Sequence, residues 1–305
     1  MGKAKIVGIG ACVMDTLITV PHYPTEDTKL RAEGTVLAGG GPTATGIVAA
    51  SKLGESCGFI GVLSDDSSGH FLREDFAKYG VDCENVDMIP GHRAFTSCIW
   101  LSRESTSRTC VFDKGDLPPL VLDEKKKQAI RDAEILMLDG NELNAAVEAA
   151  KIARESGTKV LYDAGGLYEG IEKLLPYVDI LIPSKEYALG FTGKSTVEEA
   201  AKELYERYSP EVVVITTGKT GGIIYCGEEV IHYPIYPAEV VDSNGAGDVF
   251  HGAFAAALAK GFDFEKACHF SSAVSGLKCT GVGARRSVPD YDTTVKYLKE
   301  NGYNV

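Results

Sequence analysis

The stretch that decides the architecture of this chain is Val240-Val241-Asp242-Ser243-Asn244-Gly245-Ala246-Gly247-Asp248-Val249-Phe250. Its order predicts an apolar strand, a turn of small residues and a helix that begins near a carboxylate. The amides of Gly245, Ala246 and Gly247 would be unpaired donors at the positive end of the helix dipole, where they can hold a phosphoryl group. Asp248 would lie beside them as a base, so the stretch predicts phosphoryl transfer to an alcohol.

Glycine-rich turns between a strand and a helix also bind dinucleotides. This turn lies near the end of the 305 residues and lacks the G-x-G-x-x-G spacing expected after a first strand. A nicotinamide-dependent oxidoreductase is therefore the weaker alternative.

Composition indicates a globular protein with a large core, because 44% of the 305 residues are hydrophobic. The net charge of -12 and the single short basic run at 125–127 indicate no nucleic-acid partner. Eight scattered cysteines without a C-x-x-C pair indicate free thiols in a reducing compartment. We find no signal-peptide pattern and no apolar run long enough for a bilayer, so we expect a cytoplasmic protein without a membrane partner.

Apolar runs alternate with helical patterns along nearly the whole chain, which predicts an α/β fold with a mostly parallel sheet covered by helices on both faces. Strands are expected at 6–9, 56–60, 135–138, 159–162, 180–183, 212–216 and 222–226. Helices are expected at 44–53, 68–79, 145–156, 197–208, 249–260 and 264–279. No repeat or linker divides the chain, so we expect a single domain over residues 1–305.

Two segments interrupt this alternation, at about 15–36 and 96–112, and their patterns are typical of antiparallel strands. They could form a small β-sheet lid that excludes water from a transferring phosphoryl group, or an ordinary edge hairpin. A lid would expose apolar residues such as Ile18, Val20, Ile99 and Trp100, so we expect a homodimer through paired lids.

Four further patterns each permit a binding interpretation and a plain structural one. Gly39-Gly40-Gly41-Pro42-Thr43-Ala44-Thr45 could approach a small polar ligand or simply start a helix, and Asp15 could bind sugar hydroxyls or form a turn. The segment at 214–222, with Thr216, Gly218, Lys219 and Gly221, could bind nucleotide phosphates or merely end a strand. The glycine loop at 281–286 could wall an adenine or end a helix.

In their order along the chain these motifs resemble the ribokinase/PfkB family of sugar kinases, over essentially its whole length. Residues 242–248 match the family signature D-T-x-G-A-G-D, and Ser243 keeps the hydroxyl of the usual threonine. The resemblance implies a ribokinase-like fold and transfer of the γ-phosphoryl group of ATP to a sugar hydroxyl. It also implies Mg2+ and, as in many relatives, a monovalent cation such as K+.

The resemblance assigns roles residue by residue. Asp248 is the base and the amides of Gly245, Ala246 and Gly247 form the anion hole. The other assignments are Asp15, Gly40, Gly41 and Thr45 at the sugar; Arg108 at the transferred phosphate; Thr216, Gly218 and Gly221 at the nucleotide phosphates; Gly283 and Ala284 near the base; and Asp242, Asn244 and Ser287 at the monovalent cation.

Two positions depart from the family pattern. Thr45 stands where asparagine is usual, and the N-x-x-E motif appears as Ser184-Lys185-Glu186-Tyr187, which leaves Glu186 as the candidate Mg2+ residue, through water.

The identity of the acceptor is less specified. Residues 23–27 and the Arg108-Thr109 strand resemble ketohexokinases, while 40–45, 250–253 and 277–280 resemble bacterial sulfofructose kinases. Lys29 matches a sulfonate-binding lysine of the latter, but Asn141 replaces the expected arginine and removes a bidentate anion clamp. We therefore expect a neutral, fructose-like ketose, with a sulfofructose or phosphosugar second, then a nucleoside, then a non-catalytic sugar sensor.

Overall fold

One large sheet organises the part of the chain that the structure, a computed structural model, describes: residues 3–105 and 107–305. Its strand order is β13-β12-β11-β10-β9-β8-β1-β4-β5, parallel throughout except at the β11–β12 and β12–β13 pairs. The strands are β1 (Ile6–Ile9), β4 (Cys57–Ser64), β5 (Asp82–Ile89), β8 (Ile135–Leu138), β9 (Lys159–Ala164), β10 (Ile180–Pro183), β11 (Val212–Thr216), β12 (Gly222–Tyr225) and β13 (Val230–Tyr233).

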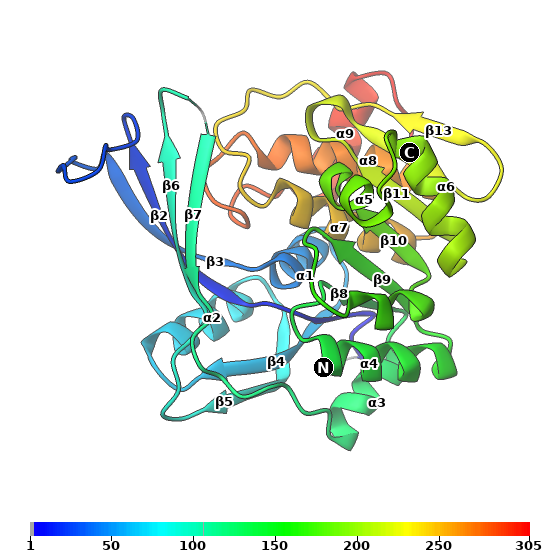
Figure 1. Ribbon diagram of the computed structural model, residues 1–305, viewed down its shortest axis with the longest axis horizontal. Helices are drawn as coiled ribbons and strands as arrows, with labels where there is room; N and C mark the ends of the chain where they lie inside the picture. The colour runs from blue at the N-terminus through cyan, green and yellow to red at the C-terminus, as the bar shows by residue number, and fades with distance from the viewer. Residues whose placement is uncertain (1–2, 106) are drawn as a thin grey trace.

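Helices cover both faces of this sheet (Figure 1). They are α1 (Pro42–Lys52), α2 (Ser67–Lys78), α3 (Glu124–Asp132), α4 (Leu143–Ser156), α5 (Lys185–Thr192), α6 (Val197–Tyr208), α7 (Ala246–Ala259), α8 (Phe264–Lys278) and α9 (Tyr291–Glu300). The predicted α/β architecture is confirmed.

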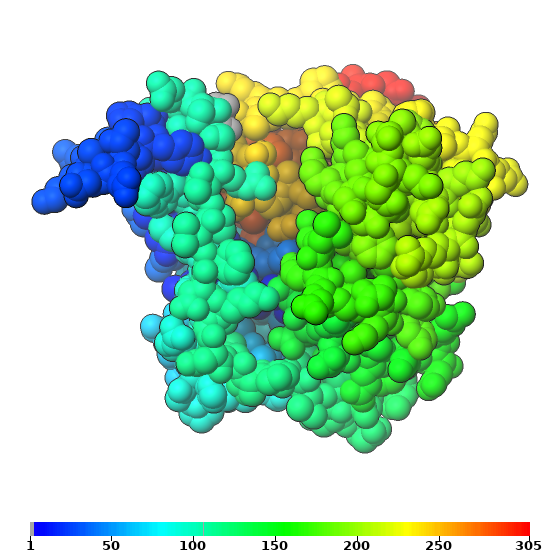
Figure 2. Space-filling model, in the orientation of Figure 1, coloured from blue at the N-terminus to red at the C-terminus, as the bar shows by residue number. Residues whose placement is uncertain are grey.

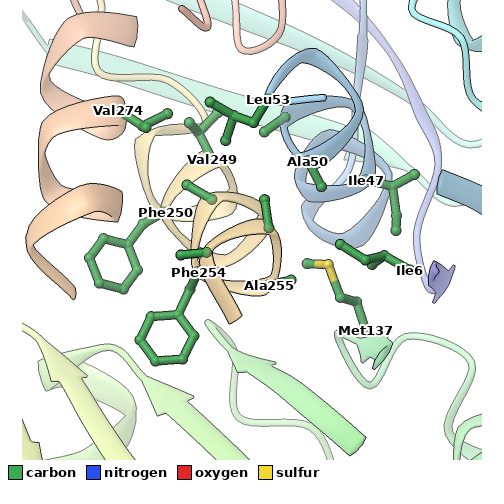
Figure 3. Packing of buried hydrophobic residues seen from close by; sticks show 14 of the residues in the cluster. Ile6, Ile47, Ala50, Leu53, Met137, Val249, Phe250, Phe254, Ala255 and Val274 are labelled. Atoms are coloured by element: carbon green, nitrogen blue, oxygen red, sulfur yellow. The ribbon is translucent and has the colours of Figure 1, made fainter. Parts of the chain in front are cut away.

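Alternate residues of each central strand enter two separate cores, because successive side chains point to opposite faces of a sheet. Ile6 and Met137 belong to the core beneath α1, α7 and α8, whereas Val7 and Leu136 belong to the core beneath α3 to α6. Figure 3 shows the first core, where Ile6 and Met137 approach α1 and α7. Both helices are thereby fixed against this face of the sheet.

A second sheet stands at one side of the main body (Figure 1) and has the order β3-β2-β6-β7. Its strands are β2 (Val13–Val20), β3 (Gly34–Gly40), β6 (Thr96–Ser102) and β7 (Ser107–Asp113). Each lid segment forms an antiparallel pair as predicted, but the two pairs join through a parallel contact between β2 and β6. We call these four strands the lid.

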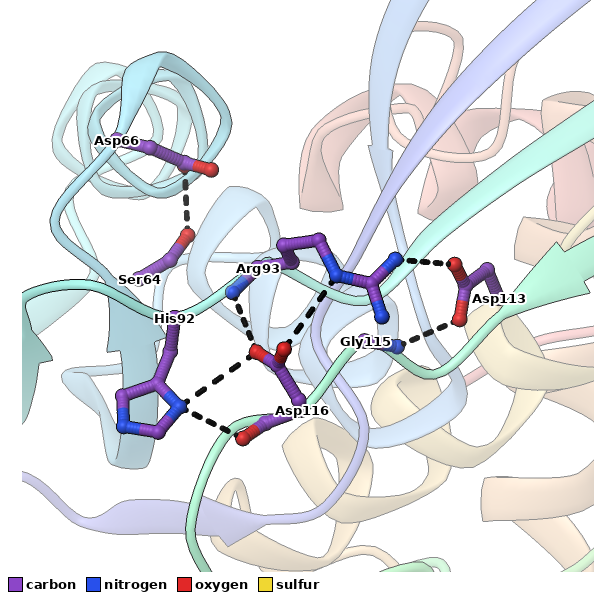
Figure 4. Close-up of polar contacts among 7 residues, drawn as sticks. All are labelled: Ser64, Asp66, His92, Arg93, Asp113, Gly115 and Asp116. Carbon is purple, nitrogen blue, oxygen red and sulfur yellow. Dashed lines mark hydrogen bonds and ion pairs between the residues drawn. The ribbon is translucent and has the colours of Figure 1, made fainter.

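Charged side chains hold the lid where its strands return to the main body (Figure 4). Arg93, before β6, bonds to Asp113 Oδ2 at 2.9 Å and to Asp116 Oδ2 at 3.4 Å, while His92 Nδ1 lies 2.8 Å from the Asp116 carbonyl. Arg93, Asp113 and Asp116 are exposed, so each ion pair stabilises the fold only slightly, but together they tie both ends of the β6–β7 hairpin.

The expected strand at Val240 and Val241 is wrong. Both side chains are more than half exposed, and the Val241 amide bonds to the carbonyl of Cys279 at 2.8 Å rather than to a strand. An apolar pair without a neighbouring strand cannot form a ladder. No helix that the structure describes is long and apolar enough to cross a bilayer.

Candidate active site

The glycine turn before α7 has a backbone that only glycine tolerates. Gly245 has φ of 73°, and a Cβ there would overlap Ala284. Within the described residues the amides of Gly245 and Gly247 have no acceptor, but the Ala246 amide donates to the Ser243 carbonyl at 3.2 Å. The turn therefore offers two free amides at the N-terminus of α7 instead of three, because it closes on itself at Ala246.

Asp248 lies in the first turn of α7 and is only partly exposed. Burial raises the pKa of its carboxyl, with a further increase from Asp139, while His251 and Arg108 act in the opposite direction. A carboxylate whose pKa is raised accepts a proton more readily near neutral pH. The position and pKa of Asp248 suit a general base.

A buried His251–Asp163 pair lies behind Asp248, and sequence reasoning missed its role. His251 Nδ1 lies 2.6 Å from the Gly247 carbonyl and 3.1 Å from Asp163 Oδ2, and Nε2 lies 3.0 Å from the Ile182 carbonyl. Burial raises the pKa of Asp163, and the charge of His251 opposes that rise. A histidine inside an apolar helix was the available signal.

Asp15 and Gly40 meet at the base of the lid. Oδ1 of Asp15 accepts from Ser97 Oγ at 2.6 Å, and a Cβ at Gly40 would overlap Oδ2 of Asp15. Gly41 has φ of 92° and would otherwise overlap the Ala11 carbonyl. Burial raises the pKa of Asp15 to about 6. The structure thus brings these three predicted sugar residues together at one end of the lid.

The Thr45 hydroxyl contacts Arg285 and not the group formed by Asp15, Gly40 and Gly41. Thr45 is fully buried, and its hydroxyl lies 3.4 Å from Nε of Arg285. The same guanidinium bonds to the Gly40 carbonyl at 2.7 Å and to Asp75 Oδ2 at 2.7 Å. The Thr45 hydroxyl is therefore an acceptor for Arg285, which ties the glycine loop at 281–286 to the Gly40 turn. Sequence reasoning missed Arg285, because nothing local indicates its distant acceptors.

Asp139 joins the ends of three elements. Its Oδ2 accepts from the amides of Ala11 at 2.9 Å and Thr43 at 3.1 Å, and its Oδ1 accepts from the Asn141 amide at 2.9 Å. It thereby caps α1, whose N-cap Gly41 has no side chain to do so. The Asn141 side chain is also occupied, since its Nδ2 bonds to Asp139 Oδ1 and to Tyr168 Oη, each at 3.2 Å.

A cavity of about 180 Å³ lies beside Ala11 and Asn141. Figure 2 shows this face hollowed between the teal residues near 95–115 and the green residues near 140–170. Charged and amide side chains line it at Lys114, Asn141 and Glu142, and Phe95 lines it as well. The Lys114 charge acts on Glu142, whose carboxyl pKa is raised mainly by burial. The cavity therefore carries opposite charges that balance each other.

The lid places Arg108 and Lys29 on different sides of the molecule. Arg108 Nη1 reaches Ser243 Oγ at 3.4 Å, so the lid touches the glycine turn before α7. Lys29 lines a cavity of about 420 Å³ with Ile18 and Trp100. Ile18 alternates with Asp15 along β2, so this cavity lies on the lid face opposite to Asp15. Within the described chain Lys29 is not brought to the sugar residues.

The predicted phosphate residues lie around the end of β11. Gly218 has φ of 64° and Gly221 has φ of 88°, and a Cβ at Gly221 would overlap the Tyr233 carbonyl. Lys219 is exposed in the same turn, and Thr216 ends the strand.

Gly283 and Ala284 lie elsewhere, against the glycine turn before α7. The Gly283 amide bonds to Asp242 Oδ2 at 2.8 Å, and Ala284 packs on Gly245. Their predicted proximity to the adenine stays a prediction.

The residues beside the end of β11 fit a bound Mg2+ ion. Ser184 caps α5 through the Tyr187 amide at 3.1 Å, and an isolated bridge joins Ser184 to Thr216. Glu186 is exposed beside that bridge and has no partner within the described residues. No cluster of three or more metal-binding side chains occurs among residues 3–105 and 107–305. Mg2+ needs only one or two carboxylates beside phosphate oxygens and water, so a single free Glu186 suits it.

The residues predicted for a monovalent cation do not fit one. The carbonyls of Asp242 and Asn244 both accept from the ammonium of Lys278, and the Asp242 carboxylate is occupied by the amides of Asn244 and Gly283. The Ser287 hydroxyl lies against Gly281. The predicted oxygen set is thus already bonded within the chain.

Free amides at a helix N-terminus, a carboxylate of raised pKa beside them and a buried carboxylate at the base of a lid suit phosphoryl transfer to an alcohol. A protein-family model with the description "pfkB family carbohydrate kinase" matches residues 3–291 of the chain. The chain belongs to this family, and it is a carbohydrate kinase of the ribokinase-like type.

Similar proteins support this assignment across the whole chain. A ribokinase from Haemophilus influenzae is 25% identical over 97% of this chain and 99% of its own length. A ketohexokinase from Mus musculus is 26% identical over 92% of this chain and 97% of its own. The structure of Arabidopsis thaliana ribokinase complexed with ribose and ATP has a TM-score of 0.87 at 25% identity, with 98% of this chain and 99% of that chain covered.

Proposed function

We propose that this protein transfers the γ-phosphoryl group of ATP to a hydroxyl of a small sugar. The observation that carries the proposal is the position of Asp248 beside the free amides of Gly245 and Gly247 at the N-terminus of α7. Asp248 would take the hydroxyl proton as the oxygen attacks in line, and the amides would meet the charge that develops on the transferred group. Arg108 would add its charge from the lid, and Asp15 would hold the sugar hydroxyls.

Mg2+ would neutralise the phosphate oxygens of ATP, and Glu186 would hold its water ligands. The Arabidopsis ribokinase structure, solved with ribose and ATP, supports the choice of nucleotide. A phosphate that lies at the Gly218 and Gly221 turn would be reached by Lys219.

The charges that line the 180 Å³ cavity favour a neutral sugar as the acceptor. Of the residues that line it, Lys114 is the cationic one, and Glu142 compensates it. Asn141 is bonded to Asp139 and Tyr168 and offers no charge to an anion. We therefore infer a neutral, fructose-like ketose, in keeping with the mouse ketohexokinase relative, ahead of a sulfonated or phosphorylated one.

A nucleoside is the second candidate acceptor. Phe95, Val62 and Leu117 line the same cavity and form an apolar wall on which a base could stack. Asp15 and Gly40 would then hold the ribose.

The test is ADP release with Mg2+ and ATP across a panel of fructose, tagatose, ribose, sulfofructose, fructose phosphates and adenosine. We expect one neutral sugar to respond and Asp248→Asn to lose at least about 100-fold in kcat, since positioned acid–base groups contribute about 10² to 10⁴. Unchanged ATP binding and thermal midpoint in the variant control for folding. A variant that keeps more than about a tenth of kcat would remove Asp248 as base, and silence with every acceptor would favour a non-catalytic sugar sensor.

We also propose that two copies pair through their lids and that the protein resides in the cytoplasm. The 420 Å³ cavity on the outer lid face is lined by Ile18, Val20, Leu30 and Trp100, and a second lid would cover it. The eight cysteines are free thiols, which suits a reducing compartment.

A further inference from the structure

Lys278 is a buried cation at the last position of α8. It is 0% exposed, and it forms no ion pair with a carboxylate among residues 3–105 and 107–305. A buried ammonium is costly unless hydrogen bonds satisfy it. Its donors go to the backbone, namely the carbonyl of Asp242 at 2.8 Å and the carbonyl of Asn244.

These two carbonyls belong to the turn that delivers the free amides of Gly245 and Gly247. Backbone carbonyls aimed at one point form the kind of oxygen site that also suits an alkali cation. The nearby carboxylate of Asp242 is taken up by the amides of Asn244 and Gly283, each at 2.8 Å. The Lys278 ammonium therefore occupies the position at which a monovalent cation would contact the carbonyl oxygens of Asp242 and Asn244.

Resting on the proposed function, we propose that Lys278 is a positioning residue that supplies, as a fixed side chain, the positive charge of a monovalent cation at the anion-hole turn. An ammonium and K+ carry the same charge and both bind carbonyl oxygens. The side chain holds the turn in the conformation that presents Gly245 and Gly247, and its charge strengthens the field at the transferred group. The kinase consequently requires no monovalent cation.

The protein is first freed of alkali cations. It is then compared in KCl and in tetramethylammonium chloride at equal ionic strength. Three variants accompany the unmodified protein. Lys278→Ala opens a space that K+ can enter, Lys278→Met fills that space without charge, and Lys266→Ala removes an exposed charge from the same helix as the matched control. The readouts are ADP formation and the thermal unfolding midpoint.

We expect the unmodified protein and Lys266→Ala to differ less than about 2-fold in kcat between the salts. Lys278→Ala should lose about 10-fold or more in tetramethylammonium and regain most of it in KCl, since loss of one preorganised electrostatic contact costs about 10² to 10³. Its thermal midpoint should rise in KCl, whereas that of Lys278→Met should not.

Activation of the unmodified protein by KCl of about 10-fold or more would overturn the inference, as would a Lys278→Ala variant with the same rate and midpoint in both salts. If no acceptor yields ADP in either salt, the proposed function fails, but the thermal midpoints still decide the role of Lys278. If Lys278→Ala does not fold, the salt comparison on the unmodified protein decides it.

Discussion

Replacement of Asp15 by asparagine should stabilise the fold at neutral pH while it impairs sugar binding. Asp15 is 6% exposed, and burial raises its carboxyl pKa from 3.8 to about 6. The native state therefore binds this proton more tightly than the unfolded chain does. As pH rises from about 4 to about 6, the native state must ionise a buried group, so stability is lost across that window.

The size of the effect follows from the shift in pKa. About two pKa units correspond to about 3 kcal/mol at pH 7.5, and the cost falls to about 1 kcal/mol at pH 4.5. An asparagine side chain at this position would have no such cost and could still accept from the hydroxyl of Ser97. With about 2.1 cal/mol/K of unfolding entropy per residue, 3 kcal/mol corresponds to a Tm increase of about 4 to 5 °C.

The assay is thermal unfolding of both proteins at pH 7.5 and pH 4.5. Asp27→Asn is the matched control, because Asp27 is exposed in the loop between β2 and β3 and its φ of 57° suits asparagine. Sugar KM should rise about 10-fold or more in Asp15→Asn, since hydrogen bonds to a charged group contribute about 1.5 to 3 kcal/mol, while KM for ATP should stay within about 2-fold. A variant no more stable than the unmodified protein at pH 7.5, or an equal gain at both pH values, would refute the reasoning.

Two further outcomes follow from contacts that span the molecule. Arg285→Met leaves Asp75 without its ion pair and the Gly40 carbonyl without a donor. The free energy of unfolding should therefore fall by about 3 to 5 kcal/mol, whereas the exposed Arg286→Met should change it by less than about 0.5 kcal/mol. Chemical denaturation measures both, and similar losses in the two variants would contradict the assigned contacts. Light scattering at micromolar concentration should give the mass of a dimer, and Trp100→Glu on the outer lid face should shift it toward the monomer; a monomeric unmodified protein would exclude pairing through the lid.

Central elements were predictable because their patterns are local. The strands at 6–9, 135–138, 180–183 and 212–216 and the helix at 197–208 have the predicted bounds, since buried parallel strands are continuously apolar and the helix has one apolar face. β5 escaped detection because it is a polar edge strand, and α3 because its residues are mostly charged. The strand predicted at 240–241 was wrong because an apolar pair without a partner strand does not form a strand.

The sequence by itself determined the family and the glycine turn before α7, with the proposed base Asp248 beside it, because these depend on short spacings and on residues that only a tight turn at a helix start requires. Tertiary structure alone decided which charges are buried and what satisfies them. Arg285 meets Gly40 across 245 positions, and Lys278 meets Asp242 across 36. A buried charge is tolerated only where the folded chain delivers its acceptors, and no local pattern specifies that delivery. The pleat of β2 likewise decided that Asp15 and the cavity lined by Ile18 and Lys29 lie on opposite faces of the lid, because alternation along the strand separates Asp15 from Ile18 once the register is set.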